Sequence, residues 1–374
     1  MKNDSSKHGG FLPGLIRREW VLLASYGTSA LFLTQGASWL ATNPGLACGA
    51  VFFVWLFTVM MASAFAISRH ADHLALQLKE PLGTLVLTLA VTSIEVMMIS
   101  ALMLKGNNPA LARDTMFSVV MIVLGGLLGT ALLTGGLRFG EQNFNIKGVN
   151  SFLGLILPLS VLSLVMPNFT ISGGEGSFSV MHEVSLMLLS FAIYGIFLAV
   201  QTRRHQEFFN EKETESASGE EHEICAPPLV EALLMILHMI PLVVLSKQLA
   251  RLLDFSIDCG GFPAALGGLV VAVLSLSPES LTAIQAATRN QMQRSVNVML
   301  GSVLATIGMT VPAALGISLF TGKPIHLGLS PISMTLLAVT LGSCIITFGQ
   351  GQTNILQGFV HLLLFAAYIV LMFD

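Results

Sequence analysis

Charged residues are scarce in this chain. Asp, Glu, Lys and Arg make up 10% of its 374 residues, whereas 53% of the residues are hydrophobic and the mean hydropathy is +0.77. A soluble globular protein carries roughly 25% charged residues, so this composition excludes a surface that faces water on all sides. With 18 Lys and Arg against 21 Asp and Glu, the net charge of −3 also excludes a basic surface for nucleic acid.

Cysteine is also rare. The four cysteines, Cys48, Cys225, Cys259 and Cys344, are far apart in the sequence. They form neither a CxxC pair nor the spacing of a disulfide framework, so no redox function follows from them. We expect no resident cofactor.

Long hydrophobic runs are abundant. A transmembrane helix needs about 20 mostly apolar residues to cross a hydrocarbon core of about 30 Å. Eleven stretches meet or approach this length, at 19–41, 46–68, 81–104, 115–137, 150–166, 180–201, 229–250, 262–287, 295–319, 326–348 and 353–373. The sequence therefore predicts an all-α polytopic membrane protein with about 11 transmembrane helices.

The basic residues predict the orientation of these helices. The first apolar run follows a polar, basic start and is too long for the hydrophobic region of a signal peptide, so we expect it to remain as a helix. If that start is cytoplasmic, five of the 18 basic residues lie in outside loops: Lys105, Arg113, Lys247, Arg251 and Lys323. The other 13 lie inside, which favours a cytoplasmic N-terminus and a C-terminus on the opposite side.

Two acidic residues lie in the interior of predicted spans. Glu95 is 10 residues before Lys105, and Glu279 is 10 residues before Arg289. Ten helical residues cover about 15 Å, half the hydrocarbon thickness, so both carboxylates belong near the bilayer midplane. An ionisable group there costs at least about 2.5–3.5 kcal/mol and by default marks an ion or proton pathway. No Lys or Arg lies inside a predicted span to pair with either glutamate.

Hydroxyl side chains cluster beside both glutamates. They are Thr88, Thr92 and Ser93 before Glu95, and Ser275 and Ser277 before Glu279. At these spacings they share a helix face with the glutamate or adjoin it, and Pro278 frees a backbone carbonyl. Carboxylate, hydroxyl and carbonyl oxygens suit hard cations such as Ca²⁺ or Na⁺. We predict that these residues form a cation and proton site in which the two glutamates bind the metal ion.

A span rich in small residues follows each glutamate helix. Residues 125–130 (GGLLGT) align with residues 301–306 (GSVLAT). Small residues are usually packing devices, but their recurrence at matching places indicates an internal duplication. After the first span, five predicted helices precede a hydrophilic segment and five follow it, and an odd number per unit inverts the second unit. Inverted repeats are typical of secondary transporters, with the substrate site at the repeat interface.

The hydrophilic segment divides the chain. Its middle holds seven glutamates, Glu207, Glu211, Glu213, Glu215, Glu220, Glu221 and Glu223. It is interpreted either as a solvated linker or as a cytosolic segment that attracts cations or regulates the protein. The predicted organisation is an N-terminal tail and first helix (1–45), a five-helix repeat (46–200), a cytosolic acidic linker (201–228) and a second five-helix repeat (229–374).

Several of these segments resemble a known family. They are the two glutamate segments, GGLRFGEQNFN (135–145), NVMLGSVLATIGMTVP (297–312) and GQTNILQG (351–358). They resemble the cation/Ca²⁺ exchanger superfamily and its Ca²⁺/H⁺ exchanger group, in particular the bacterial ChaA-type antiporters. The resemblance implies exchange of Ca²⁺ and/or Na⁺ (K⁺) for H⁺ by alternating access in the cell inner membrane, with a periplasmic C-terminus. It also implies that Glu95 and Glu279 bind the cation and the proton.

The glutamate segments depart from the pattern of that group. Its usual Gly-Asn-x-x-Glu reads VTSIE at 91–95 and SLSPE at 275–279, so both asparagines are missing. The Ser-Pro-Glu is similar to the motif of the Na⁺/Ca²⁺ exchangers instead. Since ChaA-like members are associated with Na⁺ and K⁺ as well as Ca²⁺, a Na⁺/K⁺-selective antiporter with little Ca²⁺ transport stays open as an alternative.

Three histidines are candidates for a proton relay or gate. His238 and His361 lie inside apolar spans, and His73 lies in a polar stretch between two spans. Histidines that only pack and hydrogen-bond in the protein interior are an equal expectation.

Other function classes fit the sequence less well. A cation channel would need a pore assembled from several chains, and an enzyme would need a wet pocket of substrate size. The His-Glu pairs at 182–183 and 222–223 lack the second histidine of a zinc-protease motif. We therefore expect a transporter rather than an enzyme, with inorganic cations, protons and membrane lipid as its partners.

Overall fold

The fold is helical throughout the part of the chain that the structure describes. The computed structural model describes residues 19–41, 45–78, 82–105, 108–174, 176–201 and 226–373. Within these ranges the backbone forms helices, turns and one isolated bridge between Asn143 and Gln352, with no strand. The prediction of an all-α fold is confirmed.

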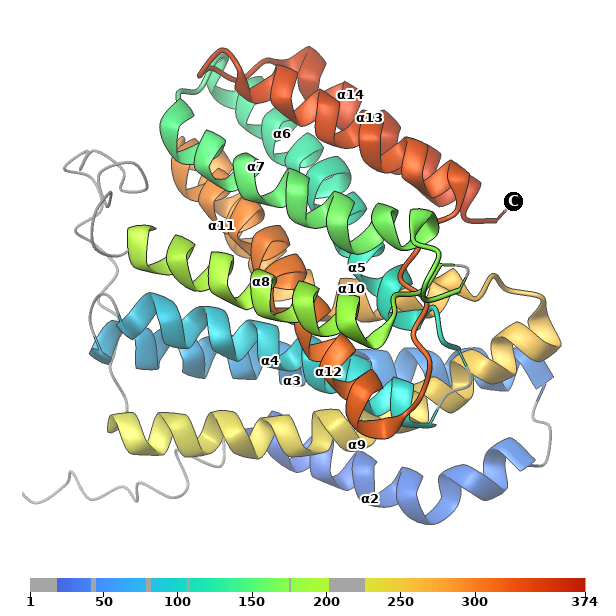
Figure 1. Cartoon of the computed structure of the whole chain (residues 1–374). Coiled ribbons are helices and arrows are strands. Elements are labelled where there is room, and N and C mark those ends of the chain that lie inside the picture. The colour runs from blue at the N-terminus through green and yellow to red at the C-terminus, as the bar shows by residue number, and fades with distance from the viewer. Residues whose placement is uncertain are drawn as a thin grey trace, which may run out of the picture.

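The helices match the predicted spans in number and order (Figure 1). The first half of the described chain holds α2 (Trp20–Ala41), α3 (Gly45–Leu78), α4 (Leu82–Lys105), α5 (Leu111–Met121), η1 (Ile122–Leu127), α6 (Leu128–Phe139), α7 (Ile146–Ser160), η2 (Val161–Val165), η3 (Met166–Phe169) and α8 (Val180–Ala199). The second half holds α9 (Pro228–Gly260), α10 (Ala265–Thr288), α11 (Met292–Ala305), η6 (Thr306–Thr310), α12 (Val311–Thr321), α13 (Pro331–Phe348) and α14 (Ile355–Leu371).

Several of these elements join end to end into longer rods. The runs α5–η1–α6, α7–η2–η3 and α11–η6–α12 each correspond to one predicted span. In the described ranges, nine helical rods are long and apolar enough to cross a membrane. The other two are α2 and the shorter apolar helix α14, which together complete the eleven predicted helices.

Each glutamate helix packs against the half of the chain to which it does not belong. Helix α4, from the first half, contacts η6 and α12 of the second half. Helix α10, from the second half, contacts α5, η1 and α6 of the first half. The two rods that receive these contacts are each interrupted near their middle by a π-helical segment, η1 or η6. Such segments occur mostly as single-turn bulges and frequently at functional sites.

Glycines allow close helix packing in both small-residue spans. A Cβ atom added to Gly129 of α6 would lie 2.9 Å from both the Gly358 carbonyl oxygen and the Leu362 amide nitrogen of α14. A Cβ atom on Gly308 of η6 would lie 2.9 Å from the ring of Tyr194 on α8. The absence of side chains at these glycines is therefore what lets α6 approach α14 and η6 approach α8.

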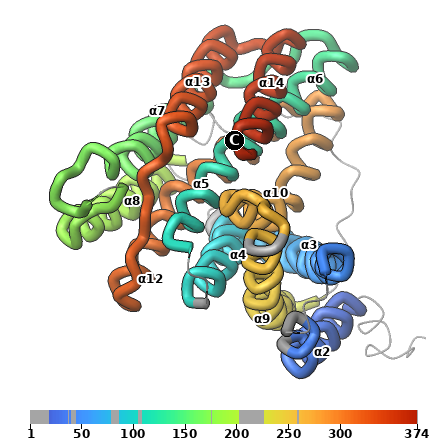
Figure 2. The backbone as a smooth tube through the Cα atoms, turned by 90° about the vertical axis from the view of Figure 1, so that its right-hand side faces the viewer, coloured from blue at the N-terminus to red at the C-terminus, as the bar shows by residue number. Residues whose placement is uncertain are grey.

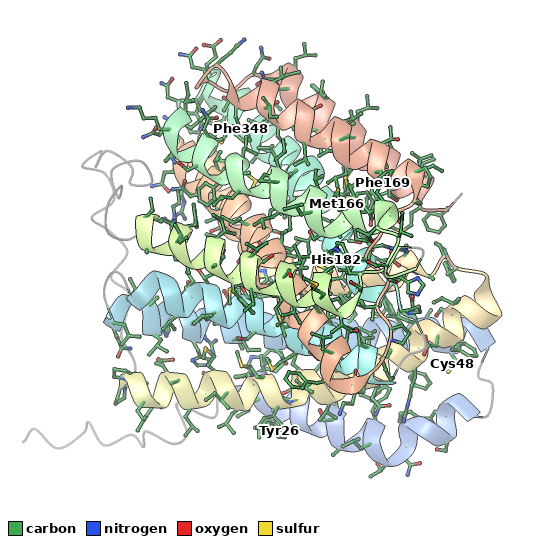
Figure 3. All side chains as sticks on the ribbon, in the orientation of Figure 1. Tyr26, Cys48, Met166, Phe169, His182 and Phe348 are labelled. Carbon is green, nitrogen blue, oxygen red and sulfur yellow. The ribbon has the colours of Figure 1, made fainter. Side chains whose placement is uncertain are left out.

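The loop before α7 is hydrogen-bonded to the loop before α14. The amide of Gln142 donates to Thr353 Oγ1 at 2.8 Å, and the amide of Thr353 donates to the Gln142 carbonyl at 2.9 Å. The amide of Phe144 donates to the Gly351 carbonyl at 3.2 Å. Two segments that carry the family resemblance, 135–145 and 351–358, therefore meet. Phe348, which ends α13 just before this contact, lies toward the left of Figure 3.

A contact of the same kind joins the loop before α13 to the loop before α8. The Leu327 amide donates to the Gly176 carbonyl at 2.9 Å, and Asn168 Nδ2 donates to the Leu329 carbonyl at 2.6 Å. Phe169 of η3, beside this contact, lies toward the right of Figure 3. The two halves thus repeat one contact pattern at opposite ends of the bundle, as an inverted duplication requires.

The boundaries at 45, 200 and 228 stay predictions. The acidic residues Glu207 to Glu223 and residues 1–18 lie outside the described residues.

The substitution Gly129→Ala should lower the unfolding temperature of the detergent-solubilised protein. Its Cβ would overlap the backbone of α14, and overpacking of this kind costs about 1–3 kcal/mol. The matched control is Gly154→Ala on α7, where a Cβ atom meets nothing within 4 Å. Equal unfolding temperatures for the wild type and both variants would contradict the close packing of α6 on α14.

Candidate functional site

A cavity of about 240 Å³ lies among α3, α4, α8, α10 and α11, which cross near the centre of Figure 1. Glu95 and Glu279 both line it. The fold therefore brings together two carboxylates that are 184 positions apart in the sequence. A third carboxylate in the lining is Asp72 of α3.

Glu95 is held by two threonines of the π-helical segment η6. Its Oε2 accepts a hydrogen bond from Thr306 Oγ1 at 2.8 Å and another from Thr310 Oγ1 at 3.2 Å. The residue is 4% exposed, and its Oε1 is buried without a hydrogen-bond partner among the described residues. One carboxylate oxygen is thus fixed by the second half of the chain, and the other is left available to a ligand.

Glu279 has a similar environment. Its hydroxyl partner is Ser302 of α11, and its Oε2 is buried without a hydrogen-bond partner in the described part of the chain. Pro278, directly before it, lies inside α10 and has no N–H to donate to the carbonyl of Leu274. This place in the helix can therefore supply backbone as well as carboxylate oxygen, as the sequence suggested.

The predicted hydroxyl residues fall into two groups. Thr88, Thr92 and Ser275 line the cavity, whereas Ser93 and Ser277 do not. The hydroxyl groups that face the cavity also bond to their own helices, since Thr92 Oγ1 donates to the Thr88 carbonyl at 2.8 Å and Ser275 Oγ donates to the Ala272 carbonyl at 3.2 Å. Rotation about one χ angle would release either oxygen toward the cavity.

Ser277 is turned away from the cavity. Its hydroxyl donates to the Val273 carbonyl one turn earlier in α10. Ser275, two residues and about half a turn earlier, lies on the cavity side of the helix instead.

Sequence reasoning missed the residues that bond directly to the glutamates. Thr306, Thr310 and Ser302 lie within the segment 297–312, whose small residues indicate an internal duplication and which carries part of the family resemblance. The four-residue spacing of Thr306 and Thr310 was the available signal, because it places both hydroxyls on one side of a helix. Nothing in the sequence indicated that this side faces Glu95 from the other half of the chain.

The three histidines proposed as a relay or gate do not line the cavity. His361 Nε2 lies 2.9 Å from Thr347 Oγ1, between α14 and α13. His238 Nε2 lies 3.1 Å from Glu19 Oε2, and His73 Nδ1 lies 3.2 Å from Glu231 Oε1. A role of these histidines in proton transfer at the cavity stays a prediction.

The charge of the cavity is unbalanced. It holds three carboxylates, and none of the described residues that line it is Lys or Arg. The free oxygens of Glu95 and Glu279 are buried, and burial of an unpaired carboxylate is costly, so each of these two glutamates must either bind a proton or share a cation. The lining offers carboxylate, hydroxyl and amide oxygens, which are the ligands of hard cations. The chemistry that this arrangement allows is reversible binding of cations and protons.

Comparisons with known proteins agree with this description. The family model of the sodium/calcium exchanger protein matches residues 48–203 and 230–373. The sodium-potassium/proton antiporter ChaA of Escherichia coli is 40% identical over 319 residues, which cover 84% of this chain and 86% of that protein. The putative ionic transporter y4hA of Sinorhizobium fredii is 39% identical over 315 residues, with the same coverage of 84% and 86%.

The fold is also found among solved structures. The structure of native YfkE superposes on this chain with a TM-score of 0.73 at 18% sequence identity. The superposition covers 94% of this chain and 99% of the YfkE chain. The similarity of fold therefore extends over both halves of the chain. The chain belongs to the sodium/calcium exchanger protein family.

Proposed function

We propose that the protein is a secondary antiporter that exchanges Ca²⁺ and/or Na⁺ (K⁺) for H⁺ at Glu95 and Glu279. The observation that carries the proposal is that both carboxylates line one cavity, each with one buried oxygen that has no partner in the described protein. The E. coli relative, a sodium-potassium/proton antiporter by name, supports the same class of activity.

Competition is the basis of coupling. A carboxylate surrounded by helices is disfavoured in its charged form unless a cation neutralises it, so it binds either a proton or a share of a metal ion. Since Glu95 and Glu279 line the same cavity, a cation that contacts both displaces their protons, and protons displace the cation. Each species therefore leaves the site only when the other replaces it.

Alternating access follows from the way the halves interlock. Helix α4 packs on η6 and α12, and α10 packs on α5 and α6, so a rocking motion of one half against the other moves both glutamates together. A doubly ionised empty site would carry two unpaired charges through that motion. The desolvation cost makes this crossing slow, which prevents leakage and enforces exchange.

A second candidate is a Na⁺/K⁺-selective antiporter with little Ca²⁺ transport. It is supported by the 40% identity to the E. coli relative and by the replacement of the two asparagines of the Ca²⁺/H⁺ group by Thr92 and Leu276. Two carboxylates in one cavity equally suit a single divalent ion, whose charge they balance.

We place the protein in the cell inner membrane with a cytoplasmic N-terminus and a periplasmic C-terminus. The excess of Lys and Arg in the loops on the N-terminal side supports this orientation. A cation channel is the competing class, and it differs in that ions would cross without obligatory exchange.

Replacing either glutamate should abolish cation-driven proton flux. In Glu95→Gln and Glu279→Gln the side chain keeps its shape but loses the exchangeable proton and the negative charge. The measurement is fluorescence of a pH-sensitive dye in everted membrane vesicles after addition of cation. Glu183→Gln is the control, because Glu183 is a buried carboxylate of α8 that does not line the cavity. Cation-driven proton flux at the wild-type rate in either cavity variant would contradict exchange at Glu95 and Glu279.

Removing a threonine hydroxyl beside Glu95 should weaken cation binding. Thr306→Val and Thr310→Val each delete one hydrogen bond to the carboxylate, and such a bond to a charged group is worth about 1.5–3 kcal/mol. Protons then compete better, and we expect the half-maximal cation concentration to rise at least about tenfold. Thr340→Val is the control, since Thr340 is buried on α13 against Met121. An unchanged concentration dependence in both cavity variants would remove η6 from the site.

A titration of vesicle proton release with Ca²⁺, Na⁺ and K⁺ at several pH values separates the candidates. We expect release with each cation and a half-maximal concentration that rises as the pH falls, by up to about tenfold per pH unit for one competing proton. Release with Na⁺ and K⁺ but not Ca²⁺ would select the second candidate. A pH gradient that collapses without added exchange cation would indicate a channel.

A further inference from the structure

A second buried polar cluster lies away from the transport cavity, where α2, α3 and α9 meet. It consists of Glu19, directly before α2, Arg69 and His70 on α3, and Glu231 and His238 on α9. Figure 2 shows these three helices side by side at the bottom of the molecule, and they contact one another. Except for Arg69, the members are at most 5% exposed, and none of the five lines the cavity. The function proposed above does not use them.

We propose that Glu19, His70 and His238 bind one divalent transition-metal ion of the Zn²⁺ class. The three side chains present one Glu19 carboxylate oxygen and two imidazole nitrogens, all within 4.8 Å of one another. They come from three segments that are far apart in the sequence, so the fold itself assembles the ligand set.

The distances suit a small metal ion. Glu19 Oε2 lies 3.4 Å from His70 Nε2 and 3.1 Å from His238 Nε2. Ligand atoms at about 2.0–2.1 Å from a tetrahedral Zn²⁺ are about 3.4 Å from one another. Binding therefore requires only small movements of these side chains, and the fourth position would be open to water.

Glu231 orients His70 in the manner of a metal ligand. His70 Nδ1 lies 2.5 Å from Glu231 Oε2, so its N–H donates to that carboxylate and its Nε2 carries a lone pair toward Glu19. A carboxylate that holds the distal nitrogen of a coordinating histidine is the usual outer contact of zinc sites. His73 Nδ1, 3.2 Å from Glu231 Oε1, in turn fixes this carboxylate.

The charge of the cluster calls for an added cation. Arg69 Nη2 donates to both oxygens of Glu19, at 2.8 and 3.0 Å. With neutral imidazoles, the carboxylates of Glu19 and Glu231 and the guanidinium of Arg69 sum to a formal charge of −1. Two imidazoles and one carboxylate favour Zn²⁺, Co²⁺ or Ni²⁺ over the oxygen-seeking Ca²⁺ and Na⁺.

Protons are the competing occupants. Without a metal, His70 Nε2 has Arg69 Nη2 and Glu19 Oε2 as neighbours, each at 3.4 Å, and the cluster would be a network of hydrogen bonds and ion pairs only. The metal-bound cluster and the metal-free network differ in metal content, so elemental analysis distinguishes them.

A metal in this place would clamp the first helix to the two halves. Glu19 begins α2, whereas His70 and His238 belong to the opening helices of the two predicted repeats, α3 and α9. We expect the ion to act structurally and to raise the unfolding temperature, because a ligand that binds only the folded state stabilises it.

The test uses the full-length protein, purified in detergent and stripped with a chelator. To exclude metal in the transport cavity, all samples carry Glu95→Gln and Glu279→Gln. After dialysis against Zn²⁺, elemental analysis should find one equivalent fewer in His238→Gln and in Glu19→Gln than in the parent. With Co²⁺, the parent should show d–d absorption bands that both variants lack. His361→Gln is the matched control and should bind as the parent does, since His361 contacts Thr347 and offers no ligand atom to the ion.

Equal Zn²⁺ content and equal Co²⁺ spectra in the parent and in His238→Gln would overturn the proposal and leave an ion-pair network. If both variants fail to fold, the parent protein, whose cluster is unmutated, can still test whether the site binds Zn²⁺. In that case, the parent must gain thermal stability with Zn²⁺ but not with Mg²⁺ after stripping, and no gain with Zn²⁺ would equally overturn the site.

Discussion

The cost of burying charge governs the organisation of this molecule. Charged residues make up 10% of the 374 residues. Among the described residues, the buried carboxylates lie in the cavity, in a second cluster around Glu19 and Glu231, and singly at Asp114 and Glu183. In the cavity, Glu95 and Glu279 have buried oxygens without partners among the described residues. In our proposal, an exchangeable cation or proton neutralises their charge. In the second cluster, Glu19 contacts Arg69 and Glu231 contacts His70, so these carboxylates have fixed partners in the protein. The free-energy cost of burying charge therefore accounts for both the proposed exchange site in the cavity and the fixed contacts of Glu19 and Glu231.

The cavity also explains why the two halves interlock. Glu95 of α4 in the first half accepts hydrogen bonds from Thr306 and Thr310 of η6 in the second half, whereas Glu279 has Ser302 of its own half as its hydroxyl partner. Close packing at Gly129 and Gly308 and the matching loop contacts at the two ends of the bundle keep the units in register. The proposed binding site therefore lies at the interface between the halves, where rocking of the repeats would expose it to either side.

The sequence predicts the features that depend on composition and spacing. Apolar runs indicate the helices, and the rarity of midplane charge singles out Glu95 and Glu279 directly. What it cannot give is the rotation of one helix against another. Ser275 and Ser277 are two residues apart, and only the packing of α10 decides that Ser275 faces the cavity. Likewise, only the fold shows that Thr306 bonds to Glu95, on a helix more than 200 residues earlier in the sequence. The histidines His238 and His73 contact Glu19 and Glu231 and do not line the cavity.

The central claim is that cation and protons compete for the same two carboxylates. It is tested most directly by calorimetric titration of the purified protein with cation, repeated in buffers that differ in their heat of ionisation. The account predicts that cation binding releases protons to the buffer and that this release disappears in both Glu95→Gln and Glu279→Gln. Cation binding of normal strength with no proton release in the wild type would contradict it.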